Sequence, residues 1–256
     1  MPDTTPPRNP LLPPRQSRPV RVAEAIKSWV VEQDLQPGDR LPGESEMILR
    51  FGVAKGTVRE AMRLLQAQWL IETKTGPGGG SFVGAVSRDR AFGLLSNYFY
   101  FREITIENIY QVRIMLEPEL AANLAGRLSA DQIDGLEDIM RGYAAPAQTI
   151  EDERGQHVAS LRFHARLADF ADNALLGFFI GFMAHILTDL TVFKQLYTTP
   201  NHDLWRQGRN HHLDLISALK SGDSTGAARI MRSHMEMARG LMEAHEARVM
   251  RTLSQA

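Results

Sequence analysis

Apolar residues recur at intervals of three and four along most of this chain, the spacing that places side chains on one face of an α-helix. Within residues 57–68, Val58, Ala61 and Leu65 mark such a face. The preceding residues 44–51 carry a shorter apolar pattern that stops at Gly52, and glycine readily adopts the left-handed conformation that ends helices. The pattern therefore predicts two short helices joined by a tight turn.

The residues around this helix pair complete a small domain. An amphipathic pattern over 20–33 predicts a helix before the pair. After it, strand-like segments at 70–75 and 81–83 enclose a glycine-rich tip, which predicts a β-hairpin. Three helices and a hairpin in this order form a winged helix-turn-helix, whose last helix enters a groove of DNA. We assign residues 17–84 to this domain.

Beyond a short linker at 85–90, the chain shows only helical periodicity. Seven segments carry it, at 91–101, 105–128, 129–143, 150–172, 174–196, 203–220 and 224–251. We therefore expect a mainly α protein in which the winged helix-turn-helix precedes an antiparallel α-helical bundle at 91–251. Residues 1–16 hold six prolines and few apolar residues, so we expect a disordered arm there.

Composition and charge narrow the class of protein. The 256 residues contain no cysteine, which excludes disulfides and thiolate metal sites and fits a cytoplasmic protein. Residues 1–90 carry a net charge of +3, whereas the remainder carries −4, which weakly favours nucleic acid as a partner of the first part. The apolar run 174–193 is interrupted by Gly181, His185 and Asp189, so we expect a buried bundle helix and no membrane partner.

Several motifs in these segments resemble a known family. The runs PGDRLPGESEM at 37–47, FGVAKGTVREAMRLLQ at 51–66 and GPGGGSFV at 76–83 resemble the GntR family of bacterial transcription regulators. The bundle resembles the FadR-like subfamily with its all-helical effector-binding (FCD) domain. Its matching residues are Arg113 to Glu117, Phe163, His164, Asn173, His212, Gly222, Asp223 and His234. The resemblance implies a homodimer that binds double-stranded DNA and a small effector.

The first domain offers a DNA-contacting surface. The residues that match the family's DNA-contacting positions are Arg40, Lys55, Thr57, Arg59, Gly78, Gly79 and Gly80. Cations and hydroxyls near a helix N-terminus suit phosphate and base edges, and a glycine tip allows close backbone approach. The alternative for Arg59 is a simple surface pair with Glu60. Three positions depart from the family pattern, because Ala54 and Lys55 replace a serine and an arginine, and Trp69 replaces a glycine.

Two charged residues fall on or beside the apolar stripe of the helix that Thr105 is expected to cap. Arg113 and Glu117 are four residues apart and flank core positions such as Leu116 and Leu120. A buried arginine needs an anion. That anion is either Glu117 itself, at the i, i+4 spacing, or the carboxylate of an effector, which the resemblance implies. We therefore expect the effector site to include Arg113, Glu117, Ser160 and Asn173.

Three histidines also lie on apolar helix faces. His164, His212 and His234 come from three separate helical segments, and the resemblance implies that they bind a divalent metal. Neutral imidazole suits zinc or nickel. The family's fourth ligand is usually an aspartate, where this chain has Ser160, and His157 is a possible substitute that we expect to be solvent-exposed. A metal-free pocket in which the histidines contact the effector directly is the alternative.

Together these features predict a metabolite-responsive transcription regulator, a repressor that binds a palindromic operator as a dimer and senses a small carboxylate in its bundle. The alternatives are a metal-dependent enzyme in the bundle or a metal-free sensor of another ligand class. A polar pocket in the same chain as a DNA-binding domain favours regulation over catalysis, so we expect no catalytic residue. A purely architectural DNA-binding protein would not need that pocket.

Overall fold

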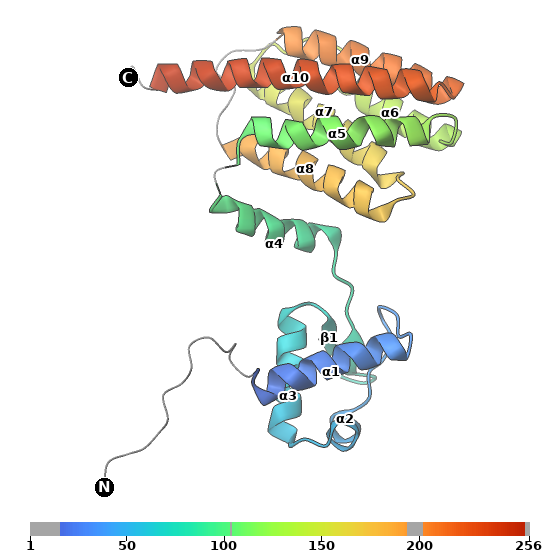
Figure 1. Ribbon diagram of the computed structural model, residues 1–256, viewed down its shortest axis with the longest axis vertical. Coiled ribbons are helices and arrows are strands. Elements are labelled where there is room, and N and C mark those ends of the chain that lie inside the picture. The colour runs from blue at the N-terminus through green and yellow to red at the C-terminus, as the bar shows by residue number, and fades with distance from the viewer. Residues whose placement is uncertain (1–15, 103, 194–201, 254–256) are drawn as a thin grey trace. The chain divides into compact units, whose positions relative to one another are not determined.

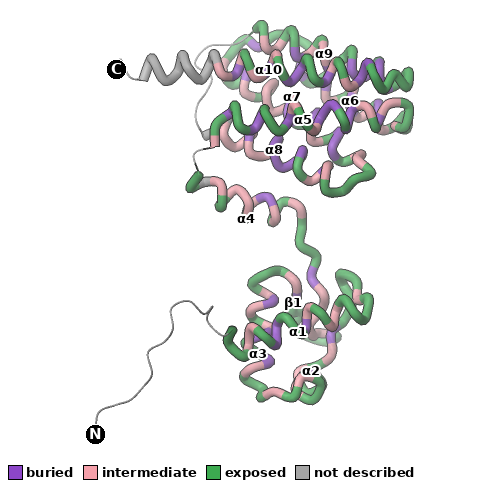
Figure 2. Tube along the Cα trace, in the orientation of Figure 1, coloured by how far each residue is buried: buried purple, intermediate pink, exposed green. Residues whose placement is uncertain are grey.

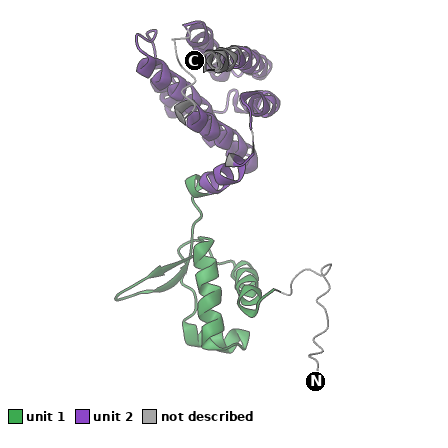
Figure 3. Cartoon of the chain, turned by 90° about the vertical axis from the view of Figure 1, so that its left-hand side faces the viewer, with its two compact units in different colours: residues 1–90 green, residues 91–256 purple. Residues whose placement is uncertain are grey.

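A computed structural model describes residues 16–102, 104–193 and 202–253 of the chain. The expected disordered arm at 1–16 lies outside this part except for its last residue. The chain divides into two compact units, residues 1–90 and residues 91–256 (Figure 3).

The first unit contains three helices and a β-hairpin (Figure 1). Its elements are α1 (Arg18–Glu32), α2 (Glu44–Phe51), α3 (Lys55–Ala67), β1 (Ile71–Lys74) and β2 (Gly80–Val83). The strands are antiparallel, with Ile71 opposite Val83, and the hairpin extends away from the helices in Figure 3. Gly52 ends α2 in the left-handed conformation, with φ of 61°, as its position predicts. Ile26, Met47 and Leu65 form the centre of the core.

Trp69 occupies the turn between α3 and β1 with a positive φ of 61°. A bulky residue is rare in this conformation, which explains why glycine is the usual choice there. The indole ring lies under the guanidinium of Arg90, whose carbon is 3.9 Å from the ring centroid. This cation–π contact partly offsets the backbone strain at Trp69.

The second unit is helical throughout its described part. Its helices are α4 (Arg88–Tyr100), α5 (Ile106–Leu124), α6 (Ala130–Arg141), α7 (Ile150–Asp169), α8 (Ala174–Phe193), α9 (His202–Ser221) and α10 (Ser224–Leu253). The helix α4 starts inside the expected linker, because the hydroxyl of Ser87 accepts a hydrogen bond from the backbone N–H of Arg90. The prediction of a mainly α fold with a winged helix-turn-helix and a helical bundle is confirmed.

Capping boxes fix the starts of three bundle helices. Thr105, Ser129 and Thr149 each accept a hydrogen bond from the backbone N–H three residues later, and the side chain at that later position bonds back to the cap's own N–H. These reciprocal bonds satisfy donors that a helix start leaves free. These caps determine the residue at which α5, α6 and α7 each begin. They thereby determine the position along the bundle axis of the residues that each helix directs into the core.

The bundle core is formed by the apolar stripes of these helices (Figure 2). The helix α10 packs against α5 and α9, and α7 packs against α8. Leu120, Leu136, Phe163, Ile180 and Leu219 are among its fully or almost fully buried residues. Within the described ranges, no helix has both the length and the apolar character that crossing a bilayer requires.

Two glycines hold the turns of the bundle together at one end. Gly126 follows α5 with φ of 74°, and Gly222 joins α9 to α10 with φ of 75°. The N–H of Gly126 donates to the carbonyl of Leu219 at 2.8 Å. A Cβ on Gly126 would lie 3.2 Å from the Cα of Gly222, so both the backbone conformation and the space favour glycine there.

We expect Gly126→Ala to lower the free energy of unfolding by about 1–3 kcal/mol, because it adds left-handed strain and crowds Gly222. The matched control is Gly135→Ala within α6, where a Cβ meets nothing within 4 Å. That change should stabilise the protein by about 0.5–1 kcal/mol through the higher helix propensity of alanine. Urea denaturation of the full chain measures both, and equal midpoints for the two variants would contradict this account.

Candidate metal centre and nucleic-acid interface

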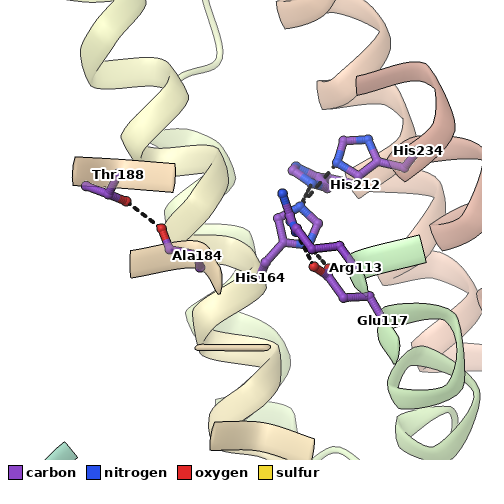
Figure 4. A network of polar contacts seen from close by, with 7 residues as sticks. All are labelled: Arg113, Glu117, His164, Ala184, Thr188, His212 and His234. Carbon is purple, nitrogen blue, oxygen red and sulfur yellow. Dashed lines mark hydrogen bonds and ion pairs between the residues drawn. The ribbon is translucent and has the colours of Figure 1, made fainter. Parts of the chain in front are cut away.

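Three histidines from three helices meet in the bundle (Figure 4). His164 comes from α7, His212 from α9 and His234 from α10, and all three are at least 96% buried. The Nε2 atom of His164 lies 3.1 Å from Nε2 of His212 and 3.2 Å from Nε2 of His234. The sequence placed each histidine on an inward face, and the fold brings their Nε2 atoms together.

The outer nitrogens of two of these rings have polar partners. Nδ1 of His164 lies 2.6 Å from Oε2 of Glu117 and donates to it, which leaves a lone pair on Nε2 of His164. Nδ1 of His212 lies 2.7 Å from the hydroxyl of Tyr143, which also lies 2.9 Å from the sulfur of Met140. Because that hydroxyl can donate to Nδ1 or accept from it, both tautomers of His212 fit this contact.

The lone pair on Nε2 of His164 lies 3.1 Å from Nε2 of His212, where it can accept the ring N–H of His212 or share a cation with the other rings. An added proton is disfavoured as that cation, because burial lowers the pKa of His164, His212 and His234. Nitrogens bound to one zinc-like ion at about 2.1 Å are separated by about 3–3.5 Å, which matches two of the observed separations. The three imidazoles therefore fit a divalent metal.

A buried ion pair lies beside the histidines. Nε of Arg113 is 2.5 Å from Oε1 of Glu117, and both side chains are 1% exposed. Burial alone would raise the pKa of Glu117, but the charge of Arg113 and the hydrogen bonds from Arg113 and His164 lower it to about 2. Glu117 thus stays ionised. The first alternative for the partner of Arg113 is realised, while Nη2 of Arg113 has no hydrogen-bond partner in the described part of the chain.

A cavity of about 40 Å³ adjoins these groups, with room for more than one water-sized group. Its polar lining comes from Arg113, Ser160, His157, His164 and His234, among others. Ser160 lies one turn before His164 and is one of the residues that line the cavity. The expectation that His157 is solvent-exposed is wrong: this residue is half-buried and lines the cavity with Ser160 and His164, and desolvation lowers its pKa to about 3.

Asn173 is not brought into this cavity. Its side chain is exposed, and Oδ1 accepts hydrogen bonds from the backbone N–H groups of Leu175 and Leu176, 3.1 Å away each. Asn173 therefore starts α8, which accounts for an asparagine at this position without a ligand.

Two residues of the site were missed by the sequence reasoning. Glu153 is buried and lines the cavity, and the successive intervals from Glu153 to His157, Ser160 and His164 are four, three and four residues, so a polar helical stripe could have revealed it. Tyr143 is the last residue of the helix expected at 129–143, but α6 ends at Arg141, so helical periodicity does not set the direction of the Tyr143 side chain.

The expected DNA-contacting cations share one face at the start of α3. Lys55 and Arg59 are exposed, and both pair with Glu44 of α2, at 3.1 Å and 2.7 Å. Glu60, the alternative partner considered for Arg59, pairs with Arg63 instead. Thr57 is half-buried on the same first turn. No side chain caps α3 and its first turn holds no acidic residue, so its N-terminal N–H groups are available to an anion.

The wing is tied to the rest of the first unit by Arg40. Its Nη2 donates to the carbonyl of Gly79 at 2.7 Å, and Arg40 forms an isolated bridge with Phe82. A Cβ on Gly79 would lie 2.6 Å from the carbonyl of Lys74, so the turn itself requires glycine. A groove of about 510 Å³ runs between this hairpin and α3. Its lining includes Arg40, Glu44, Arg59, Arg63, Gly80 and Ser81.

Comparisons with known proteins agree with this arrangement. Residues 19–83 match the family described as bacterial regulatory proteins, gntR family. Residues 108–237, half of the chain, match the FCD domain.

Curated relatives and a solved structure extend the likeness over most of the chain. The Uxu operon regulator of Haemophilus influenzae is 24% identical over 220 residues, covering 84% of this chain and 78% of the relative. The transcriptional repressor NanR of Citrobacter rodentium is also 24% identical over 220 residues, covering 84% and 81%. The structure of Streptococcus agalactiae GntR matches with a TM-score of 0.59 at 21% identity, covering 86% of this chain and 98% of that one, which supports the fold.

We expect Glu117→Gln to lower the free energy of unfolding by about 3–5 kcal/mol, because it leaves the buried Arg113 without its counter-charge. Glu119→Gln is the matched control, since Glu119 is an exposed carboxylate two residues later on the same helix. That change should alter stability by less than about 0.5 kcal/mol. Chemical denaturation measures the free energy of unfolding of both variants. Equal values would show that the ion pair is not needed for stability.

Proposed function

This chain belongs to the GntR family of bacterial regulatory proteins and carries an FCD domain, and from that premise we propose that it is a metabolite-responsive repressor whose bundle binds a small carboxylate beside a metal ion. The family and the relatives are transcription regulators and not enzymes. The proposal rests mainly on one observation: a buried guanidinium with an unpartnered Nη2 lines the same cavity as His164 and His234, two of the three clustered histidines.

The metal would be held by Nε2 of His164, His212 and His234. Zinc and nickel both accept three imidazoles and leave further positions for oxygen ligands. When bound, the ion would supply a positive charge that attracts and orients oxygen atoms of an effector. Ser160 brings no charge of its own to the cavity, so this chain would leave more of the ion's coordination to water or the effector.

The effector would be an anion because of Arg113. Nε of Arg113 donates its hydrogen bond to Glu117, so Nη2 is left to donate to a second acceptor. A carboxylate satisfies such a donor through a charge-assisted hydrogen bond. Burying the guanidinium without that second acceptor leaves a polar group unsatisfied, which is costly in a low-dielectric interior. The cavity therefore supports a small organic acid as the effector class.

Regulation would follow from a difference in affinity between two arrangements of the protein. Two copies of the winged domain in a two-fold dimer would bind a palindrome, since matching half-sites mirror the symmetry of the protein. An effector bound in the bundle can change operator affinity only if it prefers one arrangement. The protein would work in the cytoplasm, where bacterial DNA is found. The name of the NanR relative supports the assignment as a repressor.

The metal and effector assignments can be separated by two substitutions. We expect His212→Ala to lose zinc or nickel, while His185→Ala, which removes a half-exposed histidine paired with Asp189, should retain it. Arg113→Gln should keep the metal and weaken binding of a small carboxylate at least about ten-fold, because a charged hydrogen bond contributes about 1.5–3 kcal/mol.

Native mass spectrometry measures whether each variant retains the metal. Calorimetry with lactate, pyruvate and citrate as probes measures the affinity for a small carboxylate. Thermal melting must show that each variant is folded. If Arg113→Gln binds all three acids as the unmodified chain does, Arg113 is not an effector ligand.

A third substitution tests whether Arg59 contributes to sequence-specific DNA binding. We expect Arg59→Ala to reduce affinity for the cognate operator by about 1–3 kcal/mol and to relax base preference. Arg50→Ala on α2 is the control, because Arg50 stacks on Trp29 away from the groove. Mobility shifts on a duplex enriched from a random library by the full chain provide the measurement. An unchanged base preference in Arg59→Ala would remove Arg59 from the reading surface.

A further inference from the structure

The carboxylate of Glu44 bridges the two cations at the start of α3. Oε1 of Glu44 is 3.1 Å from Nζ of Lys55, and Oε2 is 2.7 Å from Nε of Arg59. The side chain of Glu44 is 34% exposed, less than those of Arg59 at 58% and Lys55 at 61%. The anion is therefore the better anchored member of the group, and the two longer cationic side chains are held to it.

The start of α3 is electrostatically unfavourable without this anion. Lys55 and Arg59 are four residues apart, so two like charges occupy neighbouring positions on one helix face. Both also lie near the positive end of the helix dipole, and the first turn of α3 contains no acidic residue. Glu44 supplies from α2 the negative charge that α3 lacks, which lets both cations share one face of α3, from which Arg59 lines the groove.

The contact also fixes the direction of the Arg59 side chain. Its Nε donates to Glu44, which leaves the two terminal amino groups for another acceptor. Those two groups form the edge that binds two acceptors on guanine or two phosphate oxygens. An arginine held in this way loses less side-chain freedom when it meets a base.

We propose that Glu44 is a positioning residue for DNA reading, which holds Arg59 and Lys55 so that the winged domain discriminates between sequences. The inference rests on the proposed contact of Arg59 with bases. It goes beyond that contact because Glu44 itself needs to touch no DNA atom.

Because Glu44 is negatively charged, its removal should affect sequence-specific and non-specific DNA binding differently. A carboxylate beside the reading face repels phosphate and offsets part of the charge of Lys55 and Arg59, so it weakens binding that depends on phosphates alone. Hydrogen bonds from Arg59 and Lys55 lower the pKa of Glu44, so the side chain is ionised at neutral pH. Exposed ion pairs add little to folding stability, so removing this one should leave melting unchanged.

The test compares Glu44→Gln with Glu46→Gln in the full chain. Glu46 lies two residues later on α2 and pairs with Arg50, so its substitution removes the same charge without touching α3. For each variant, affinity is measured on the selected operator duplex and on a scrambled duplex, at several salt concentrations.

For Glu44→Gln we expect the ratio of operator to scrambled affinity to fall about ten-fold. Affinity for the scrambled duplex should stay the same or rise, with a salt dependence steeper by up to about one unit. Glu46→Gln should leave the ratio unchanged. Arg59→Ala is measured alongside, and we expect its ratio to fall as well.

The possible outcomes are distinct. If Arg59→Ala keeps the full ratio, the proposed base contact fails, and the inference fails with it. If Arg59→Ala lowers the ratio but Glu44→Gln behaves like Glu46→Gln, the base contact stands and the positioning role is overturned. A fall in affinity of Glu44→Gln for both duplexes together with a lower melting temperature would show a structural role instead, which also overturns the inference.

Discussion

The carboxylate of Glu117 is the group on which the site in the bundle depends. It neutralises a guanidinium that is 1% exposed and, through its other oxygen, orients His164. A buried charge without a partner would cost several kcal/mol, so Arg113 can face the cavity only because Glu117 lies beside it. One side chain of α5 thereby compensates the charge of the buried guanidinium and sets the tautomer of His164.

The groups proposed to bind ligands belong to helices that also form the core. His164, His212 and His234 lie on three helices whose remaining inward residues form the core, and their ligand nitrogens lie within 4.8 Å of one another. A cation among them would join α7, α9 and α10, and an acid on Arg113 would add α5. Ligands bound there would therefore act on how four helices pack, and packed cores respond by switching between discrete arrangements.

Each unit uses one glutamate to bridge two basic side chains, with different physical consequences. Glu44 does so in water, where charges are screened and the pairs contribute little energy, so geometry is what it provides. Glu117 does so in the core, where both geometry and charge compensation matter because the dielectric is low. The same chemistry thus holds two exposed cations in one unit and compensates a buried guanidinium in the other.

The sequence by itself determined the elements and the inward residues. Helical spacing placed Arg113 and the three histidines on apolar faces, Thr105 and Ser129 marked helix starts, and the glycine-rich tip marked the wing. These signals are local, because caps and periodicity depend on residues within a turn or two. Only the tertiary structure decided which groups meet.

The tertiary structure brought His164 of α7 to Glu117 as a second partner and placed His157 in the cavity lining. It left Asn173 outside the cavity and paired Glu44 with Arg59 across the turn between α2 and α3. Such contacts depend on how each helix is rotated and set against its neighbours. That rotation follows from the packing of all the apolar stripes at once, which no single stretch of sequence contains.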